Sequence, residues 1–207
     1  LYLPFKNEPS STIKNIILAA EDRSFFQHQG VDFLAILRAC FQNIFSGRRV
    51  SGASTITMQF IRLQTNYPRN WSSKIKEAWY AQKLERYYSK DQILKAYLNN
   101  APFGSNVYGL ETASLFYFSK STEFLSLEEL ALLLGLPQAP SRLRPDRYLV
   151  KANNRKNVIL NRMIQNHTLK KDIANHYLSQ PIQLNIHANG NNKLTIPLAI
   201  KTSMGKG

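Results

Sequence analysis

Cysteine and acidic residues are scarce in this chain. The first scarcity excludes a class of protein, and the second indicates a kind of partner. The 207 residues include one cysteine, Cys40, so an internal disulfide is impossible and a disulfide-stapled scaffold is excluded. Its apolar neighbours favour a buried thiol. Aspartate and glutamate number 13 against 27 lysines and arginines, which gives a net charge of +14 at pH 7. This imbalance predicts an anionic partner or surface.

Long hydrophobic runs are missing as well. The longest one, residues 130–136, is far shorter than the roughly 20 residues that span a bilayer, and no signal-peptide pattern opens the chain. We therefore expect no membrane-spanning helix, and we interpret the chain as a domain of a longer protein whose anchor and export signal lie outside it. With 43% hydrophobic residues, disordered and collagen-like classes are excluded and one compact body is expected.

Apolar residues at helical spacing predict a mostly α-helical fold over about the first 180 residues. Polar residues able to cap a helix N-terminus precede several of these runs: Ser11, Asp32, Ser54, Ser89 and Ser126. A longer helix is expected over about residues 72–88. From residue 180 the pattern alternates, as in β-strands, at 182–186 and 193–200. We therefore predict a domain over residues 1–179, and a linker or the start of a following module, with a short β-like tail, over 180–207.

Two adjacent carboxylates, Glu21 and Asp22, come near the end of the first predicted helix. Helical geometry places Glu21 at the edge of the apolar stripe and turns Asp22 away from it. Both the helix dipole and shelter from water disfavour a charged carboxylate there, so we expect a raised pKa for Glu21. Such a group suits a general base or acid. The alternative is a surface pair satisfied by Arg23 or His28.

The segment 52–59 brings small residues and hydroxyls to a predicted helix N-terminus, directly after Arg48 and Arg49. Free amides and hydroxyls at such a position can hold phosphate or sugar oxygens. Ordinary helix capping explains the same residues structurally. The segment alone leaves both interpretations open.

Glu77 occupies a core-like face of the helix predicted over 72–88. Its neighbours at helical spacing are Ala81, Leu84 and Tyr88. Cations flank it in the sequence: Lys74, Lys76, Arg62 and Arg69. This pattern indicates a sheltered carboxylate beside cations, with an exposed salt-bridged helix face as the alternative. A further basic stretch, residues 142–171, fits solvated surface, phosphate-rich membrane or nucleic acid equally.

Taken in order, four of these patterns resemble the peptidoglycan glycosyltransferase domain of class A penicillin-binding proteins and monofunctional transglycosylases, over about residues 12–165. They are Glu21-Asp22-x-x-Phe25-x-x-His28-x-Gly30, Gly52-x-Ser54-Thr55-Ile56-Thr57-x-Gln59, Lys74-x-x-Glu77, and Leu84-Glu85 followed by Ser89-Lys90-x-x-Ile93-Leu94-x-x-Tyr97-Leu98-Asn99. Residues 136–147 are similar to the type one-C branch. Met58 and Ser73 depart from the family pattern, which has Gln and Arg at those positions.

The resemblance implies a lysozyme-like helical fold with a larger globular lobe and a smaller membrane-facing lobe. Its substrate would be lipid II, a disaccharide-pentapeptide on undecaprenyl pyrophosphate. Glu21 would deprotonate the acceptor 4-hydroxyl, which attacks the donor anomeric carbon and inverts it to a β-1,4 link. Glu77 would place or polarise the donor pyrophosphate. The negative charge that grows on the leaving pyrophosphate would be offset by Lys74, Lys76, Arg62 and Arg69. The walls of the cleft would be formed by Asp22, His28, Ser54, Thr55 and Gln59.

The resemblance also implies partners and a location. No cofactor is required, with a divalent cation at the donor pyrophosphate left open. The expected partners are lipid II, the growing glycan strand and the membrane surface, and not nucleic acid. A C-terminal transpeptidase-type domain and an N-terminal membrane anchor are expected outside this chain, at the periplasmic, outer face of the bacterial cytoplasmic membrane. Ser203-x-x-Lys206 has the spacing of a penicillin-binding nucleophile, but no companion element follows, so no transpeptidase activity is assigned.

Two other functions compete. A lysozyme-type glycoside hydrolase also needs a carboxyl of raised pKa in a helical cleft, but it has no pyrophosphate to hold and so no use for cations around Glu77. A basic helical nucleic-acid-binding module is supported by the net charge alone and leaves Glu21 and Asp22 unexplained.

Overall fold

Helices form nearly all the regular structure of the chain in a computed structural model that describes residues 3–5, 7–46, 53–65, 68 and 70–186. The helices within these ranges are α1 (Ser11–Ala20), α2 (Phe33–Ser46), α3 (Ile56–Thr65), α4 (Trp71–Tyr87), α5 (Lys90–Asn100), α6 (Leu110–Phe118), the 3₁₀ turn η1 (Thr122–Phe124), α7 (Leu127–Leu134), α8 (Pro140–Leu143), α9 (Pro145–Gln165) and α10 (Lys171–Ser179). The predicted mostly helical fold is confirmed, and none of these helices is long and apolar enough to cross a membrane.

The helix starts follow the predicted caps with two shifts of one residue. Asp32 accepts from the Ala35 amide at 2.7 Å, and Ser89 and Ser126 each open a complete capping box, as predicted. Ser10, rather than Ser11, caps α1, because its hydroxyl is the one that accepts from the Ile13 amide. Thr55, rather than Ser54, accepts from the Met58 amide at the start of α3. Several adjacent hydroxyls compete for each of these caps, so the sequence could not fix the residue.

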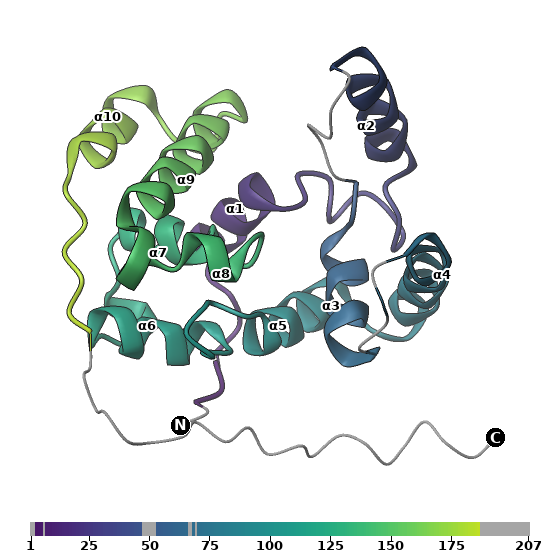
Figure 1. Cartoon of the computed structure of the whole chain (residues 1–207), viewed down its shortest axis with the longest axis horizontal. Coiled ribbons are helices and arrows are strands. Elements are labelled where there is room, and N and C mark those ends of the chain that lie inside the picture. The colour runs from purple at the N-terminus through teal and green to yellow at the C-terminus, as the bar shows by residue number, and fades with distance from the viewer. Residues whose placement is uncertain (1–2, 6, 47–52, 66–67, 69, 187–207) are drawn as a thin grey trace.

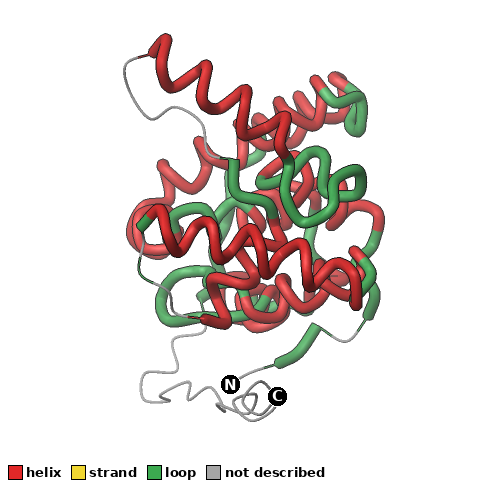
Figure 2. The backbone as a smooth tube through the Cα atoms, turned by 90° about the vertical axis from the view of Figure 1, so that its right-hand side faces the viewer, coloured by secondary structure: helices red, strands yellow, loops and turns green. Residues whose placement is uncertain are grey.

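Two separate hydrophobic cores give the chain two lobes. The larger core joins α1, α5, α6, α7 and α9, and α1 packs directly against α7 and α9. A much smaller core consists of Val31, Met58 and Ala81, beside α3 and α4. In Figure 1, α2 stands apart from the main body, and Figure 2 shows the helices in red and the connecting loops in green after a turn of 90°. Since α3 packs on both α4 and α5, it connects the two lobes.

The predicted alternating segment near the C-terminal end alternates in burial but joins no sheet within the described residues. Ile182 and Leu184 pack against the larger core, and the Asn185 amide donates to the Tyr117 carbonyl at 2.9 Å. The second alternating stretch, residues 193–200, lies outside the described residues, as do residues 48–52, Arg69, Ser203 and Lys206. The side chain of Cys40 is likewise outside what the structure describes.

Gly30 sits where the loop before α2 crosses the backbone of α4. Its φ of +79° is left-handed, and a Cβ there would lie 2.5 Å from the Gln82 nitrogen and 2.6 Å from the Ala81 carbonyl carbon. We expect Gly30→Ala to lower the free energy of unfolding by at least about 2 kcal/mol, since left-handed backbone alone costs a residue with a side chain about 1–2 kcal/mol. Chemical denaturation measures this. Gln29→Ala is the neighbouring control, and equal stability of the two variants would contradict the close approach.

Candidate active site

Glu21 ends α1 as its C-cap residue and points into the protein rather than into solvent. Its side chain is 8% exposed and lies against Arg155 of α9, with 3.4 Å between Glu21 Oε1 and Arg155 Nη2. Burial raises the pKa of the Glu21 carboxyl, and the charges of Arg155 and Arg162 and a hydrogen bond from Gln59 oppose that rise. The predicted raised pKa is confirmed, and the shelter is deeper than the predicted edge position.

Gln59 of α3 fixes the second carboxylate oxygen of Glu21. Gln59 Nε2 donates to Glu21 Oε2 at 3.0 Å, and the hydroxyl of Tyr97 in turn donates to Gln59 Oε1 at 3.1 Å. Tyr97 is 1% exposed, and burial followed by the charge of Glu21 raises its pKa well above the usual value, so it stays protonated as a donor. The amide of Gln59 is therefore oriented with its NH₂ group toward the carboxylate.

Two arginines of α9 support the end of α1, and the sequence reasoning assigned them no role there. Arg155 Nη2 donates to the Ala20 carbonyl at 2.8 Å, and Arg162 Nη1 donates to the carbonyls of Ala19 and Ala20 at 3.2 Å each. They neutralise the negative helix end on which Glu21 stands. Their spacing of seven residues, two helical turns, was the available signal.

The basic stretch over residues 142–171 is therefore not simply solvated surface. Arg155 is 10% exposed and Lys156 fully buried, its ammonium donating to the Tyr177 carbonyl at 3.3 Å. Burial lowers the pKa of both side chains. Arg155 and Lys156 are therefore part of the protein interior, which neither the surface nor the nucleic-acid interpretation predicted.

Glu77 of α4 is 3% exposed, which confirms the predicted shelter. Arg62 of α3 donates two hydrogen bonds to the Glu77 carboxylate, from Nε to Oε1 at 2.7 Å and from Nη2 to Oε2 at 2.6 Å. This hydrogen-bonded pairing raises the pKa of the Arg62 guanidinium. Forked arginine–carboxylate pairs hold both groups in one orientation. Of the predicted neighbours of Glu77, Ala81 is buried, whereas Tyr88 is 53% exposed because the helix ends at Tyr87.

The helix α3 brings the two carboxylates together. Gln59 touches Glu21 and Arg62 touches Glu77, and these two α3 residues are three apart, so they share one face of the helix within about 4.5 Å of rise. Glu21 comes from the larger lobe and Glu77 from α4 in the smaller one. Two sheltered carboxylates thus flank one side of the helix that connects the lobes.

Asp22 lies in the interior, which corrects the prediction that it points away from the apolar face. It is 7% exposed; His28 Nε2 lies 3.0 Å from its Oδ2, which also accepts from the Ile56 amide at 3.0 Å. The helical projection failed because α1 ends at Ala20 and the chain turns before Asp22. His28 is the pairing partner proposed in the alternative interpretation, but the pair is buried and holds the start of α3.

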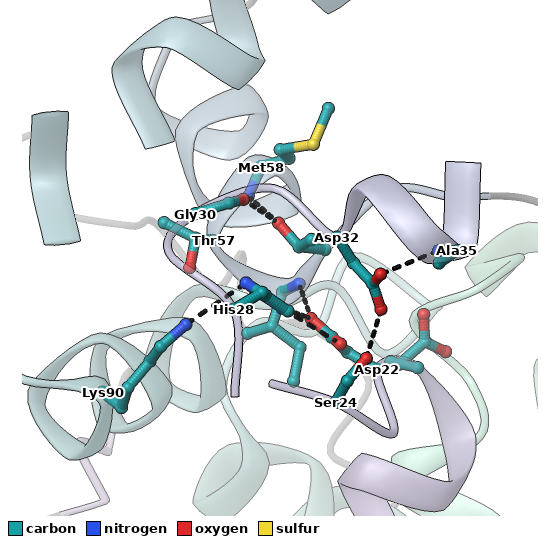
Figure 3. A network of polar contacts seen from close by, with 12 residues as sticks. Asp22, Ser24, His28, Gly30, Asp32, Ala35, Thr57, Met58 and Lys90 are labelled. Atoms are coloured by element: carbon teal, nitrogen blue, oxygen red, sulfur yellow. Dashed lines mark hydrogen bonds and ion pairs between the residues drawn. The ribbon is translucent and has the colours of Figure 1, made fainter. Parts of the chain in front are cut away.

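A chain of polar contacts continues from this pair, as Figure 3 shows with His28 between Lys90 and Asp22. The Lys90 ammonium lies 3.4 Å from His28 Nδ1 and 2.7 Å from Glu85 Oε2. Glu85 also accepts from the Gly30 amide and the Thr57 hydroxyl, both at 2.5 Å. These contacts tie the loop before α2 to α3, α4 and α5, so these residues act as framework for the site.

The remaining predicted site residues divide by position. Thr55 is 2% exposed and donates to the Gly30 carbonyl at 2.7 Å, so its hydroxyl serves the fold. Ser54 is half-buried beside it. Lys74 and Lys76 lie on α4 within one turn of Glu77, and Lys74 also faces the Trp71 ring at 6.0 Å. Arg69 lies outside the described residues.

The described residues do not form a protein-ligated metal site. No group of three or more His, Cys, Asp or Glu side chains in these ranges is placed to hold a metal ion, and Glu77 is already engaged by Arg62. A divalent cation at this position would have to be held mainly by a phosphate-bearing ligand.

Comparison with known proteins finds matches over most of the chain. A family model described as Transglycosylase matches residues 2–164. The chain is 43% identical over 164 residues to penicillin-binding protein 1C of Escherichia coli, covering 79% of this chain and 21% of that protein. It is 40% identical over 189 residues to penicillin-binding protein 1A of Rickettsia bellii, covering 89% and 24%. The chain thus spans about a quarter of the length of these curated relatives.

One solved structure adds a weaker likeness. A crystal structure of penicillin-binding protein 1A from Haemophilus influenzae aligns with 64% of this chain and 17% of its own, at 30% sequence identity and a TM-score of 0.46.

Proposed function

The chain belongs to the transglycosylase family, and from that premise we propose that it polymerises lipid II into β-1,4-linked glycan strands. The observation that carries the proposal is the pair of sheltered carboxylates, Glu21 and Glu77, on one face of α3 with cations on both sides. A hydrolase needs the first carboxylate but not the cationic surroundings of the second. The sequence motifs predicted this family, and the relatives include the predicted 1C type as well as the 1A type.

In this proposal Glu21 is the general base. The acceptor 4-hydroxyl gives its proton to a Glu21 oxygen while its own oxygen bonds to the donor anomeric carbon, and the bond from that carbon to the pyrophosphate oxygen breaks with its electron pair. Burial brings the pKa of Glu21 closer to neutral pH, where a base accepts a proton most effectively. Arg155 and Gln59 hold the Glu21 carboxylate in one orientation, so a proton-accepting oxygen stays directed toward the acceptor hydroxyl.

On the donor side, positive charge is concentrated around Glu77. Arg62, Lys74 and Lys76 lie within one turn or one contact of that residue. As the glycosidic bond breaks, negative charge grows on the departing pyrophosphate, so fixed cations stabilise the transition state more than the ground state. Glu77 then positions Arg62, and it acts on the donor through that guanidinium. We place Arg69 in the same group on its sequence position, and Asp22, His28, Ser54 and Thr55 in the framework of the cleft.

Exposed apolar side chains support a membrane surface as partner. Among the described side chains these include Phe33, Leu34, Leu37, Phe41 and Phe45 on α2, and Trp71, Ile75 and Trp79 on α4. A patch of this kind on a protein with a net charge of +14 suits an anionic lipid surface that presents a lipid-linked substrate. We therefore propose action at the periplasmic face of the cytoplasmic membrane, with residues 1–179 as the catalytic domain. Membrane anchoring and transpeptidation are assigned to parts of the protein outside this chain.

The test of the proposed function is incubation of the chain with lipid II in detergent or vesicles. The expected products are long glycan strands and free undecaprenyl pyrophosphate. Release of a lipid-free disaccharide instead would favour the hydrolase, and tight sequence-selective binding of duplex DNA without any turnover would favour the nucleic-acid module.

Arg155 should affect how the rate of polymerisation depends on pH. Because the Arg155 charge lowers the pKa of Glu21, Arg155→Gln should raise that pKa further and move the acid limb of the pH–rate profile to higher pH. Arg155→Lys, which keeps the charge, should return most of the limb toward its original position. Arg142→Gln, on the exposed side of α8, serves as the control. A loss of rate with an unmoved acid limb would make Arg155 a structural residue only.

A further inference from the structure

A cavity of about 650 Å³ lies apart from the two carboxylates, between the loop that joins α5 to α6 and the start of α9. Residues 102–108 form one wall, and α8 with the first turn of α9 forms the other. Figure 1 shows α8 in front of this part of the molecule. Part of the α8 and α9 wall belongs to the segment 136–147 that resembles the type one-C branch, but the proposed chemistry assigns no role to the residues of this cavity.

The loop wall is held in an unfavourable conformation. Ser105 and Asn106 have consecutive left-handed backbones, with φ of +52° and +59°, and the Val107 amide closes the turn on the Gly104 carbonyl at 2.8 Å. The Ser105 hydroxyl is tied to Asp146 Oδ1 at 3.2 Å. Backbone of this kind persists only where surrounding contacts enforce it, and it is often found at ligand sites. The wall is therefore built before any ligand arrives.

The lining is cationic and aromatic. It includes two arginines and two tyrosines and no acidic residue. Arg144 is occupied by Asp146, whose carboxylate lies 2.5 Å from its Nη2. Arg147 is exposed and makes no ion pair with any described residue, so its guanidinium is available. The next residue, Tyr148, is 41% exposed, and the Lys151 ammonium lies over one face of its ring, 4.7 Å from the ring centre, which leaves the other face for a ligand. A guanidinium beside an aromatic face suits a ligand that combines a carboxylate with a sugar ring.

The cavity connects to the carboxylate site through α9. Tyr148 precedes Arg155, the residue that touches Glu21, by seven residues, or about 10 Å along a helix. Tyr148 has non-helical angles, φ −133° and ψ 51°, at the junction between the first turn of α9 and its main part. One helix therefore carries both the arginine that contacts the base and part of the cavity lining.

We propose that this cavity is a second subsite, which binds a carboxylate attached to a sugar, with Arg147 on the carboxylate and Tyr148 on the sugar ring. The proposal rests on the proposed function, which supplies a substrate of this chemistry: a disaccharide with a peptide that carries free carboxylates. The subsite holds the substrate by a carboxylate of its peptide and by a neighbouring sugar ring.

The probe is the disaccharide-pentapeptide without lipid or pyrophosphate, titrated into the chain and followed by NMR or calorimetry. A second probe carries all its carboxylates as amides. Arg147→Glu should weaken binding of the free-acid probe by about tenfold, in keeping with loss of one charge-assisted hydrogen bond, and should leave the amide probe unchanged. Tyr148→Ala should weaken both probes. Arg142→Glu makes the same charge change on exposed α8 outside the cavity, and should alter binding less than twofold.

Equal losses in Arg147→Glu and Arg142→Glu would mean that bulk charge alone attracts the probe, and would overturn the subsite. Equal affinity of the acid and amide probes for the unmodified chain would overturn it as well. The readout needs no turnover, so the outcomes separate: polymerisation with no binding at the cavity refutes the subsite alone, and binding without polymerisation refutes the proposed function.

Discussion

Glu21→Gln should reduce polymerisation of lipid II at least about 100-fold while the chain stays folded, since a positioned general base contributes ~10²–10⁴. Glutamine has the shape of glutamate, and its one amide oxygen can still accept from Arg155 or from Gln59, but the side chain cannot take up the acceptor proton. Because the buried carboxylate is replaced by a neutral group, the melting temperature should stay equal or rise. Initial rates, with circular dichroism and thermal melts, measure both effects.

The matched control for that variant is Glu123→Gln, an exposed glutamate of the short 3₁₀ turn η1. It makes the same chemical change away from α3 and should leave the rate within about twofold, as surface substitutions usually do. A loss below roughly tenfold in Glu21→Gln would show that a different group accepts the proton.

Arg62→Glu should have the second largest effect. We expect it to lower both the free energy of unfolding and the turnover of the donor. The change places a second carboxylate against Glu77, which is 3% exposed, and removes both of its hydrogen bonds from Arg62. Breaking such a pair costs about 3–5 kcal/mol, a large part of the stability of a small domain. Denaturant titration should show the loss, and donor turnover should fall with it.

The charge exchange Arg62→Glu with Glu77→Arg separates the two effects. It restores an ion pair across α3 and α4 and should recover much of the stability, whereas donor turnover should stay low because the cation has moved. Arg23→Glu, an exposed arginine beyond α1, controls for net charge. Should Arg62→Glu leave both stability and donor turnover unchanged and lower only acceptor affinity, the cluster around Glu77 belongs to the acceptor or to the membrane.

The parts of the fold that could be predicted were those governed by local interactions. The capping boxes at Ser89 and Ser126 depend on residues three apart, and the apolar spacing of α1 follows directly from helical geometry. The raised pKa of Glu21 was predictable for the same reason, since shelter and a helix end both follow from the local pattern.

The parts that could not be predicted depend on distant segments. Arg155 reaches Glu21 across 134 residues, a separation that periodicity cannot register. Asp22 is buried because the chain turns at the end of α1 and brings it to His28 and the start of α3, which a helical projection cannot represent. Arg62 was expected among the cations that offset the leaving group near Glu77, but only the packing of α3 on α4 shows the two hydrogen bonds that join them.

The cavity between the α5–α6 loop and α9 shows the same limit. Its lining combines residues near 105 with residues near 147, brought together by Ser105 and Asp146. No motif marks either segment as a ligand site. Only the left-handed pair Ser105 and Asn106, neither of which is a glycine, distinguishes the loop, and that feature is visible in the backbone and not in the sequence.

A single-turnover reaction tests the central claim most directly. The donor is lipid II blocked at its 4-hydroxyl, so that it can act only as donor, and the acceptor is unblocked lipid II with a distinguishable label. The account predicts one new β-1,4 bond and one undecaprenyl pyrophosphate released for each donor consumed, with none formed by Glu21→Gln. Donor cleavage that proceeds equally without acceptor, an α-linked product, or full turnover by Glu21→Gln would contradict it.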